Sequence, residues 1–266
     1  MDTFLWVFGI CLALGAFVGF MAGLLGIGGG LIVVPALLYI LPKVGVPAAQ
    51  LPHVAIATSL AAIILTSFSS ARAHHSHGNI PWPLFKSMLP GLALGALCSG
   101  FIAELIPADD LRRAFAVFVI LMAAQMAFPF RPAAKEGLPP FPVLLIVSAI
   151  IAIIAALMGI GGGVLLVPFL TWCGLQMRQA VGFSSATGLI IALWGSLGYV
   201  IAGWNAPDMP SGTLGYVYLP ALVGIIASSM LMAPVGVKAA STWPTPVLKK
   251  IFALLLVVVG LKLILA

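Results

Sequence analysis

The chain has 266 residues, of which 62% are hydrophobic and only 7% are charged, and its formal net charge is +6 at pH 7. Soluble domains carry about 25% charged residues, so this composition excludes a soluble globular domain and indicates a protein of the lipid bilayer. The basic residues lie in short segments between apolar runs, where they orient a membrane protein and do not indicate a nucleic-acid partner.

The first half predicts four long transmembrane helices and one short apolar helix. An uncharged run at 4–25 is long enough to cross a hydrocarbon core of roughly 30 Å. A glycine break at Gly26–Gly30 follows, and the apolar run 31–41 behind it is too short to span as an ordinary helix. Three further spans are expected at 53–72, 84–105 and 114–130.

The second half predicts the same plan after a proline-rich linker at 131–140. A second break precedes the short apolar piece 164–173, and the long spans are 141–158, 180–202, 216–237 and 248–265. We therefore expect an all-α polytopic membrane protein of two homologous halves, residues 1–133 and 134–266. Each half has four long transmembrane helices and one short broken or re-entrant helix.

The expected duplication depends on a motif that occurs twice at a separation of 133 residues. Gly26–Pro35 reads GIGGGLIVVP, and Gly159–Pro168 reads GIGGGVLLVP. A second match follows near the end of each half, where Leu111–Phe115 reads LRRAF and Leu248–Phe252 reads LKKIF. Glycines with a proline at a fixed distance, repeated at half-length, indicate an internal repeat.

Two topologies remain open at this point. Re-entrant short pieces give parallel halves, with about 7 basic residues on one side and 5 on the other, whereas crossing pieces give inverted halves with about 8 and 4. Both place the N-terminus outside. The inverted arrangement, in which carriers often use broken helices that meet at the midplane, has the larger asymmetry and is the one we favour.

The two glycine breaks form the candidate substrate site. A helix that starts behind a break presents unpaired N–H groups and the positive end of its dipole. Two such starts facing one polar site attract a small anion without a buried Arg or Lys, and alternating access would come from one half moving against the other. The alternative is that the glycines serve close helix packing. The candidate residues are Gly28, Gly29, Gly30, Gly161, Gly162 and Gly163.

Hydroxyl side chains in equivalent spans form the second candidate set. They can donate to an oxyanion while staying neutral, although such groups also bond their own helix backbone. The set comprises Thr58, Ser59, Ser184, Ser185 and Thr187. His53 at a span entry is the candidate for proton coupling, because histidine titrates near neutral pH. The acidic residues all fall near span ends or in loops, which argues against a carrier of dehydrated cations.

Neither a metal site nor an enzyme is expected. His74, His75 and His77 share a short polar connector, but no acidic residue or cysteine accompanies them. No Ser–His–acid or Cys–His pattern indicates hydrolysis, and nothing in the sequence calls for a cofactor. The expected partners are a small anionic substrate and the bilayer.

A family resemblance adds to this reading. Its residues are Gly23–Gly30 with Pro35, the triplet Ala57–Thr58–Ser59, and Met158–Gly163 with Pro168. With these motifs the chain resembles the TauE/SafE family, also called the sulfite exporter or TSUP family. The resemblance implies an inner-membrane carrier of sulfite, sulfoacetate or other small organic anions, coupled to the proton gradient. The second half departs from the triplet with Ser184–Thr187 (SSAT). A passive anion channel and a non-transporting membrane subunit are the alternatives.

Overall fold

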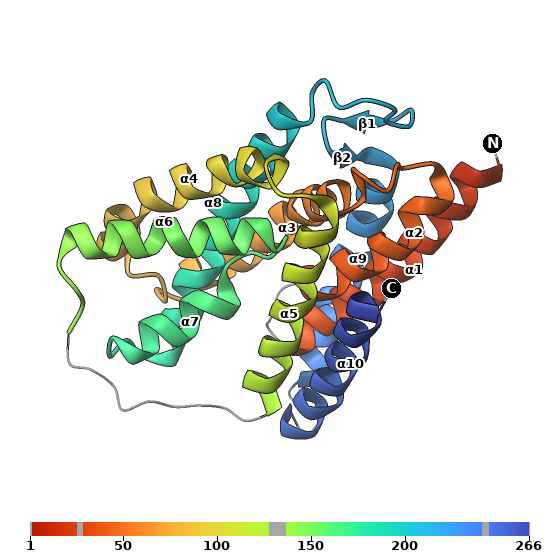
Figure 1. The fold of residues 1–266 in the computed structure, drawn as a ribbon. Helices are drawn as coiled ribbons and strands as arrows, with labels where there is room; N and C mark the ends of the chain where they lie inside the picture. The colour runs from red at the N-terminus through yellow and green to blue at the C-terminus, as the bar shows by residue number, and fades with distance from the viewer. Residues whose placement is uncertain (1, 26–28, 128–136, 241–244, 266) are drawn as a thin grey trace.

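A computed structural model describes residues 2–25, 29–127, 137–240 and 245–265. Helices make up nearly all of it, with one small hairpin near the C-terminal end of α8 (Figure 1). In chain order the elements are α1 (Asp2–Leu25), α2 (Gly30–Ile40), the 3-10 helix η1 (Leu41–Val44), α3 (Leu51–Ser76), α4 (Trp82–Glu104), α5 (Ala108–Ala127), α6 (Phe141–Leu157), α7 (Gly163–Trp172), α8 (Met177–Ala202), β1 (Thr213–Leu214), β2 (Val217–Tyr218), α9 (Leu219–Ala240) and α10 (Thr245–Leu265).

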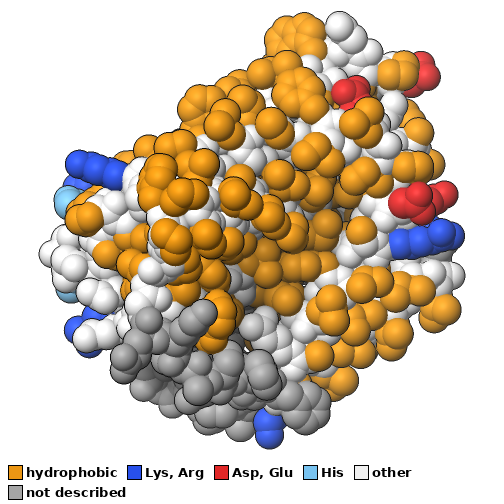
Figure 2. All heavy atoms as spheres, turned by 60° about the vertical axis from the view of Figure 1, so that its left-hand side comes forward, with side chains coloured by type: hydrophobic (Ala, Val, Ile, Leu, Met, Phe, Trp, Pro, Cys, Tyr) orange, Lys and Arg blue, Asp and Glu red, His pale blue; other side chains and the backbone are white. Residues whose placement is uncertain are grey.

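The all-α membrane architecture that the sequence predicts is confirmed. Within the described residues, α3, α4, α8 and the 219–236 part of α9 are long and apolar enough to cross a bilayer, and α1, α2, α6, α7 and α10 contain shorter apolar segments. Figure 2 shows a broad hydrophobic face whose charged side chains lie near its margins. Such a surface suits lipid, since water would leave it as an aggregation site.

Several helix boundaries differ by a few residues from those predicted, and two of them have a clear physical reason. The span expected from Tyr216 begins at Leu219, because the chain first forms an antiparallel hairpin that pairs Thr213 with Tyr218. The helix expected from 114 begins at Ala108. Its first turn then contains Asp109 and Asp110, whose negative charges suit the positive end of the helix dipole.

The two halves interleave in space. α1 packs along α9, and its counterpart in the second half, α6, packs along α4. Gly15 in α1 has no room for a Cβ beside the Ser228 hydroxyl of α9, and Gly91 in α4 has none beside the Ser148 hydroxyl of α6. Both helix pairs run parallel and depend on a glycine that lets the two backbones approach closely.

Two further strong contacts join helices at corresponding positions of the two halves. α3 packs against α8, and α5 packs against α10. The strongest helix pairs in the molecule therefore combine one helix from 1–133 with one from 134–266. α4 also packs strongly against α8. The corresponding pair, α9 with α3, makes a smaller contact, so the two halves differ at this point.

Helix ends gather at two opposite faces of the molecule. On the first, which we name the hairpin face, the turns after η1, α4 and α8 surround a pocket together with Tyr216. α1 starts and α2 ends on this face, since Lys43 Nζ lies 4.9 Å from the ring centroid of Trp6 and 4.8 Å from that of Tyr39. Lys262 near the end of α10 lies 4.9 Å from the Tyr39 centroid.

The opposite face, which we name the linker face, holds the end of α3 and the starts of α4 and α8. The ring centroids of His75 and Trp82 lie 5.4 Å apart there, and Gly182 packs against the backbone of Asn79. α6 starts on this face as well, because it runs parallel to α4. The segment 128–136 between α5 and α6 lies outside the described residues.

Candidate functional site

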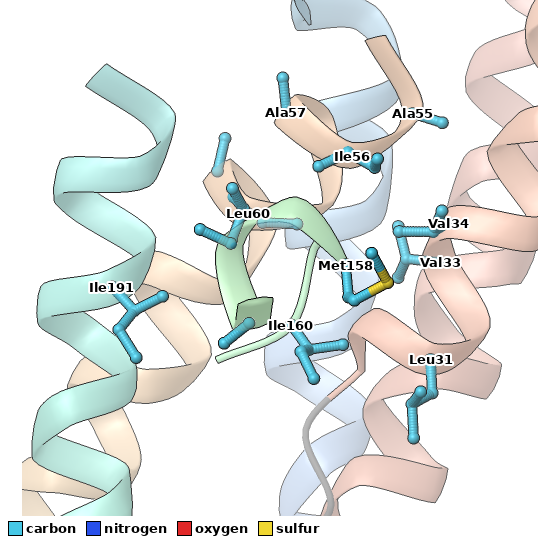
Figure 3. Close-up of a cluster of buried hydrophobic side chains, with 14 of the residues drawn as sticks. Leu31, Val33, Val34, Ala55, Ile56, Ala57, Leu60, Met158, Ile160 and Ile191 are labelled. Carbon is cyan, nitrogen blue, oxygen red and sulfur yellow. The ribbon is translucent and has the colours of Figure 1, made fainter. Parts of the chain in front are cut away.

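The second glycine break lies in the middle of the molecule. Gly159 and Gly162 have φ angles of +65° and +75°, a left-handed conformation that glycine adopts without the penalty of a Cβ. Side chains from three helices surround the break (Figure 3). Those drawn around Met158 and Ile160 include Val33 and Val34 from α2, Ile56 and Leu60 from α3, and Ile191 from α8.

The first break is described only in part. Gly26–Gly28 lie outside the described residues, so the role predicted for Gly28 lies outside them too. Gly29 and Gly30 are buried, and the Gly29 carbonyl accepts the N–H groups of Ile32 and Val33, each at 3.0 Å. Gly29 therefore serves as the N-cap of α2, as Gly162 does for α7.

The two breaks meet. Gly30 packs directly against the Gly159 carbonyl and against Ile160, so that a Cβ on Gly30 would overlap the carbonyl. The Ser59 hydroxyl from α3 donates a 2.8 Å hydrogen bond to the same carbonyl. A helix start of the first half and the break of the second half thus share one buried contact, with Ser59 fixing its geometry.

Little space remains beside this contact. A cavity of about 10 Å³ next to Gly29 is large enough for about one water molecule. Its polar lining includes Thr66 and Ser229, and the rest is apolar. The sequence interpretation places the two breaks across a polar site, and in the described residues they instead touch and pack among apolar side chains. The structure therefore has the start of α2 packed against the first residue of the second break, with little space between them.

Hydroxyl groups gather around the start of α7. A Cβ on Gly163 would lie 2.8 Å from Ser184 Oγ, and one on Gly161 would lie 3.8 Å from Ser67 Oγ. Ser70 and Ser185 hydrogen-bond to each other at 2.9 Å one helical turn nearer the linker face. In the described residues no side chain caps the start of α7, so its first N–H groups lie beside hydroxyls of α3 and α8.

The two threonines among the predicted residues are engaged elsewhere. Thr58 Oγ1 accepts the N–H of Tyr218 at 3.0 Å, which ties α3 to the hairpin. Thr187 donates to the carbonyls of Phe183 and Ser184 at 3.1 Å each, within its own helix. Both contacts fit a structural role. Of the predicted serines, Ser59 bonds the second break and Ser184 lies beside the start of α7. Ser185 bonds Ser70 at 2.9 Å and the Val181 carbonyl of its own helix at 3.0 Å.

The sequence did not single out the hydroxyl groups that the later part of α3 places near the breaks and at the contact with α8. Thr66, Ser67 and Ser70 face the breaks or the α3–α8 contact, yet they have no hydroxyl counterparts at equivalent positions of the second half. The signal available was the density of hydroxyls in the 53–72 run. They were not selected because the candidate hydroxyls were restricted to positions matched in both halves.

His53 lies apart from the breaks, at the hairpin face. Its ring is buried and stacks on Tyr216, with centroids 5.2 Å apart. Its Nε2 donates to the carbonyl of Ala103 over 2.9 Å. It lines a pocket of about 680 Å³ that is formed by the turns of that face.

The three histidines at the end of α3 make local contacts. The Asn79 side-chain amide lies 3.3 Å from Nδ1 of His74, and Nδ1 of His77 lies 2.7 Å from the Ala73 carbonyl. Across the described ranges, no three His, Cys, Asp or Glu side chains converge on a point suited to a metal ion.

Comparison with known proteins gives a consistent picture. Residues 11–263 match the family described as "Sulfite exporter TauE/SafE". A "Probable membrane transporter protein" of Haemophilus influenzae is 37% identical, over 96% of this chain and 97% of its own length. Similar proteins of Methanocaldococcus jannaschii and Bacillus subtilis are 27% and 26% identical, over 87% and 97% of this chain and 84% and 97% of their own lengths. No solved structure matches significantly.

Proposed function

The chain belongs to the TauE/SafE sulfite exporter family of membrane transporters, and we propose that it exports small anions across the inner membrane as a secondary transporter driven by the proton gradient. The proposed substrates are sulfite, sulfoacetate and other organosulfonates. The observation that carries the proposal is the contact of Gly30 with Gly159, which brings the start of one short helix against the break that precedes the other. In many secondary transporters broken helices meet near the middle of the membrane, where the substrate binds.

We further propose that the two halves are inverted. α1 and α2 leave the hairpin face and return to it, as the contact of Lys43 with Trp6 indicates. α3, α4 and α5 then cross in turn, which is an odd number of crossings and leaves the second half to start on the linker face. The matching Gly15–Ser228 and Gly91–Ser148 contacts support equivalence of the α1–α9 and α6–α4 pairs.

The charges of the two faces support an orientation. Among the side chains that the structure describes, the basic residues at the linker face are Arg72, Lys86, Arg178, Lys238 and Lys250, and those at the hairpin face are Lys43, Arg112, Arg113 and Lys262. The hairpin face also has the acidic residues Glu104, Asp109, Asp110 and Asp208. Since basic residues accumulate on the cytoplasmic side, the linker face is cytoplasmic and the exported anion leaves through the hairpin face.

The hydroxyls beside the start of α7 would receive the anion from the cytoplasm. Uncapped N–H groups at Gly162 and Gly163 would donate to its oxygens, and Ser184 and Ser67 would add hydroxyl donors. The closed contact of Gly30 with Gly159 would then separate to let the anion pass outward. No basic side chain is needed at this depth, where a buried charge is costly.

Transport assays with purified protein in liposomes test this proposal. Vesicles with protein in a known orientation would be loaded with sulfite, sulfate, thiosulfate or a small sulfonate, and efflux would be measured with and without an imposed pH gradient. We expect efflux of at least one sulfur-containing anion to accelerate when the acidic side is the hairpin-face side. Efflux that ignores the gradient would identify a passive channel. Absence of binding and efflux, with constant co-purification of a partner, would identify a non-transporting subunit.

A further inference from the structure

We propose that the pocket on the hairpin face is a proton-receiving vestibule, in which Glu104 takes a proton from the outside solution and passes it to Nδ1 of His53. This proposal rests on proton-coupled export as proposed above and names the groups that perform the coupling. The sequence indicates His53 alone as a candidate for proton coupling. The proposal also specifies the proton donor, Glu104, the accepting atom, Nδ1 of His53, and the pocket in which the transfer takes place.

The pocket has the size and the walls of a chamber. Its volume of about 680 Å³ lies within the range of roughly 300–1,000 Å³ that is usual for ligand sites. Three separate turns and the hairpin contribute to it, so its shape depends on the assembly of both halves. Its polar lining side chains are Gln50, His53, Glu104, Asn205 and Tyr216.

His53 has one nitrogen ready for a proton. The residue is only 4% exposed, and Nε2 donates to the Ala103 carbonyl at 2.9 Å, which assigns the ring proton of the neutral form to Nε2. In the neutral ring Nδ1 therefore carries no proton and has a free lone pair. Within the described part of the chain this atom has no hydrogen-bond partner. Buried polar atoms normally have partners, so an enclosed and unpaired basic nitrogen on a residue that lines a pocket is a site where a proton can be added.

Glu104 is the group that meets the solution. It is exposed at the end of α4, directly after the residue that accepts the His53 hydrogen bond. It lines the same pocket as His53 and Tyr216. Burial, followed by the Glu104 charge, raises the pKa of the Tyr216 phenol. Tyr216 thus remains neutral and holds the imidazole by stacking, without competing for the proton.

Other ionisable groups near the chamber have different partners or positions. In the first turn of α5, Arg112 pairs with Asp109 at 3.6 Å and Arg113 pairs with Asp110 at 3.7 Å. From α8, Tyr199 is fully buried behind Tyr216, with ring centroids 6.5 Å apart. Asp208 lies exposed beside the pocket residue Pro207. Among the described residues that line the pocket, Glu104 is the one acidic or basic side chain other than His53 and Tyr216.

The proton step is simple and balanced. A hydronium ion outside protonates the Glu104 carboxylate. Since Nδ1 of His53 has no hydrogen-bond partner among the described residues, the resulting acid donates its proton to Nδ1 after a movement that brings the two groups within hydrogen-bond distance. The products are an imidazolium ion and a regenerated carboxylate, with no other reactant. The carboxylate at the exit repels an anion in the vestibule, and it is restored once the proton has passed to His53.

The test compares two assays on the same proteoliposomes. One measures exchange of labelled substrate at equal pH on both sides, and the other measures net transport driven by a pH gradient. For Glu104→Gln and His53→Gln we expect the ratio of driven transport to exchange to fall about tenfold or more, as for loss of a proton-transfer group. Asp110→Asn is the control, because Asp110 lies on the same face but outside the pocket, and its ratio should equal that of the wild type.

Glu104 is exposed, so its variant folds even if His53→Gln does not. A wild-type ratio in Glu104→Gln would overturn the vestibule. Equal loss of both activities would overturn it too, since that pattern indicates general damage. If the wild type exchanges anions but ignores a pH gradient, the vestibule is wrong while anion transport stands. If the wild type neither exchanges nor transports, the proposed function fails first and the vestibule with it.

Discussion

The Ser59 hydroxyl of α3 donates a 2.8 Å hydrogen bond to the carbonyl of Gly159, which lies 100 residues later in the chain. Both groups are buried. A carbonyl released from a helix by a glycine break needs a donor from elsewhere in the protein, and Ser59 supplies it from the other half. The bond therefore couples the α3 helix to the point where the two breaks meet.

Replacing Ser59 by Ala should destabilise the protein by about 1–3 kcal/mol, because the buried Gly159 carbonyl loses its donor. The measurement is thermal unfolding in detergent. Ser69→Ala is the control, since Ser69 lies exposed in the same helix and should leave the melting temperature almost unchanged. Equal melting temperatures for the two variants would show that the bond contributes nothing.

Adding a single methyl group at Gly30 should separate the two breaks. Gly30→Ala places a Cβ onto the Gly159 carbonyl, and overpacking of this kind costs about 1–3 kcal/mol. Both stability and anion efflux should fall. Gly9→Ala, which meets no atom within 4 Å, should change neither. Normal efflux from Gly30→Ala would mean that the contact has no part in transport.

Gly162→Leu should abolish anion binding while the protein still inserts into the membrane. A side chain there strains the left-handed backbone and meets Ile191, so the start of α7 must shift. Binding is measured by thermal shift with sulfite and small sulfonates. Gly45→Leu has the same kind of backbone strain in open space and should keep binding. A Gly162 variant that binds as well as the control would contradict an anion site at this helix start.

Joining α3 to α8 should stop transport reversibly. Ser70→Cys with Ser185→Cys, in a chain whose three cysteines are replaced by Ala, places two thiols where hydroxyls lie 2.9 Å apart. Oxidation should form a disulfide that closes the approach to α7 and reduces efflux to background, and a reductant should restore it. Undiminished efflux in the oxidised protein, with the disulfide confirmed by mass spectrometry, would exclude this route.

The orientation can be tested with single cysteines in the same cysteine-free chain. A membrane-impermeant maleimide on intact cells should label Asp208→Cys, which lies exposed at the hairpin face, and should leave Lys86→Cys at the linker face unlabelled until the cells are opened. The reverse pattern would place the N-terminus inside and the vestibule in the cytoplasm.

The local features of the fold could be predicted from the sequence because they depend on neighbouring residues. A run such as 141–158 is long and apolar, and in lipid a helix satisfies its backbone hydrogen bonds within the segment. The glycines at 159–163 break that helix wherever it packs. Helix ends were less predictable, as at Ala108, because acidic residues that stabilise a first turn also occur in loops.

The contacts between the halves could not be predicted in this way. Nothing near Ser59 in sequence indicates that its partner is Gly159, since the bond depends on how α3 crosses the second break. Glu104 likewise looks like any carboxylate at a helix end. It becomes notable only because the turn after α8 and the hairpin fold over it beside His53. The apolar packing around the breaks was also hidden, because Leu60 and Ile191 resemble lipid-facing residues in sequence.

The interleaving of the helices also bears on how the protein is made. Since α1 lies along α9 and α6 along α4, the opening helix of each half finds its main neighbour in the other half. During synthesis α1 must wait in the bilayer until α9 emerges from the ribosome, with its glycine groove facing lipid meanwhile. A chain severed between α5 and α6 would yield two incomplete fragments, and co-expression of both would be needed to recover an active carrier.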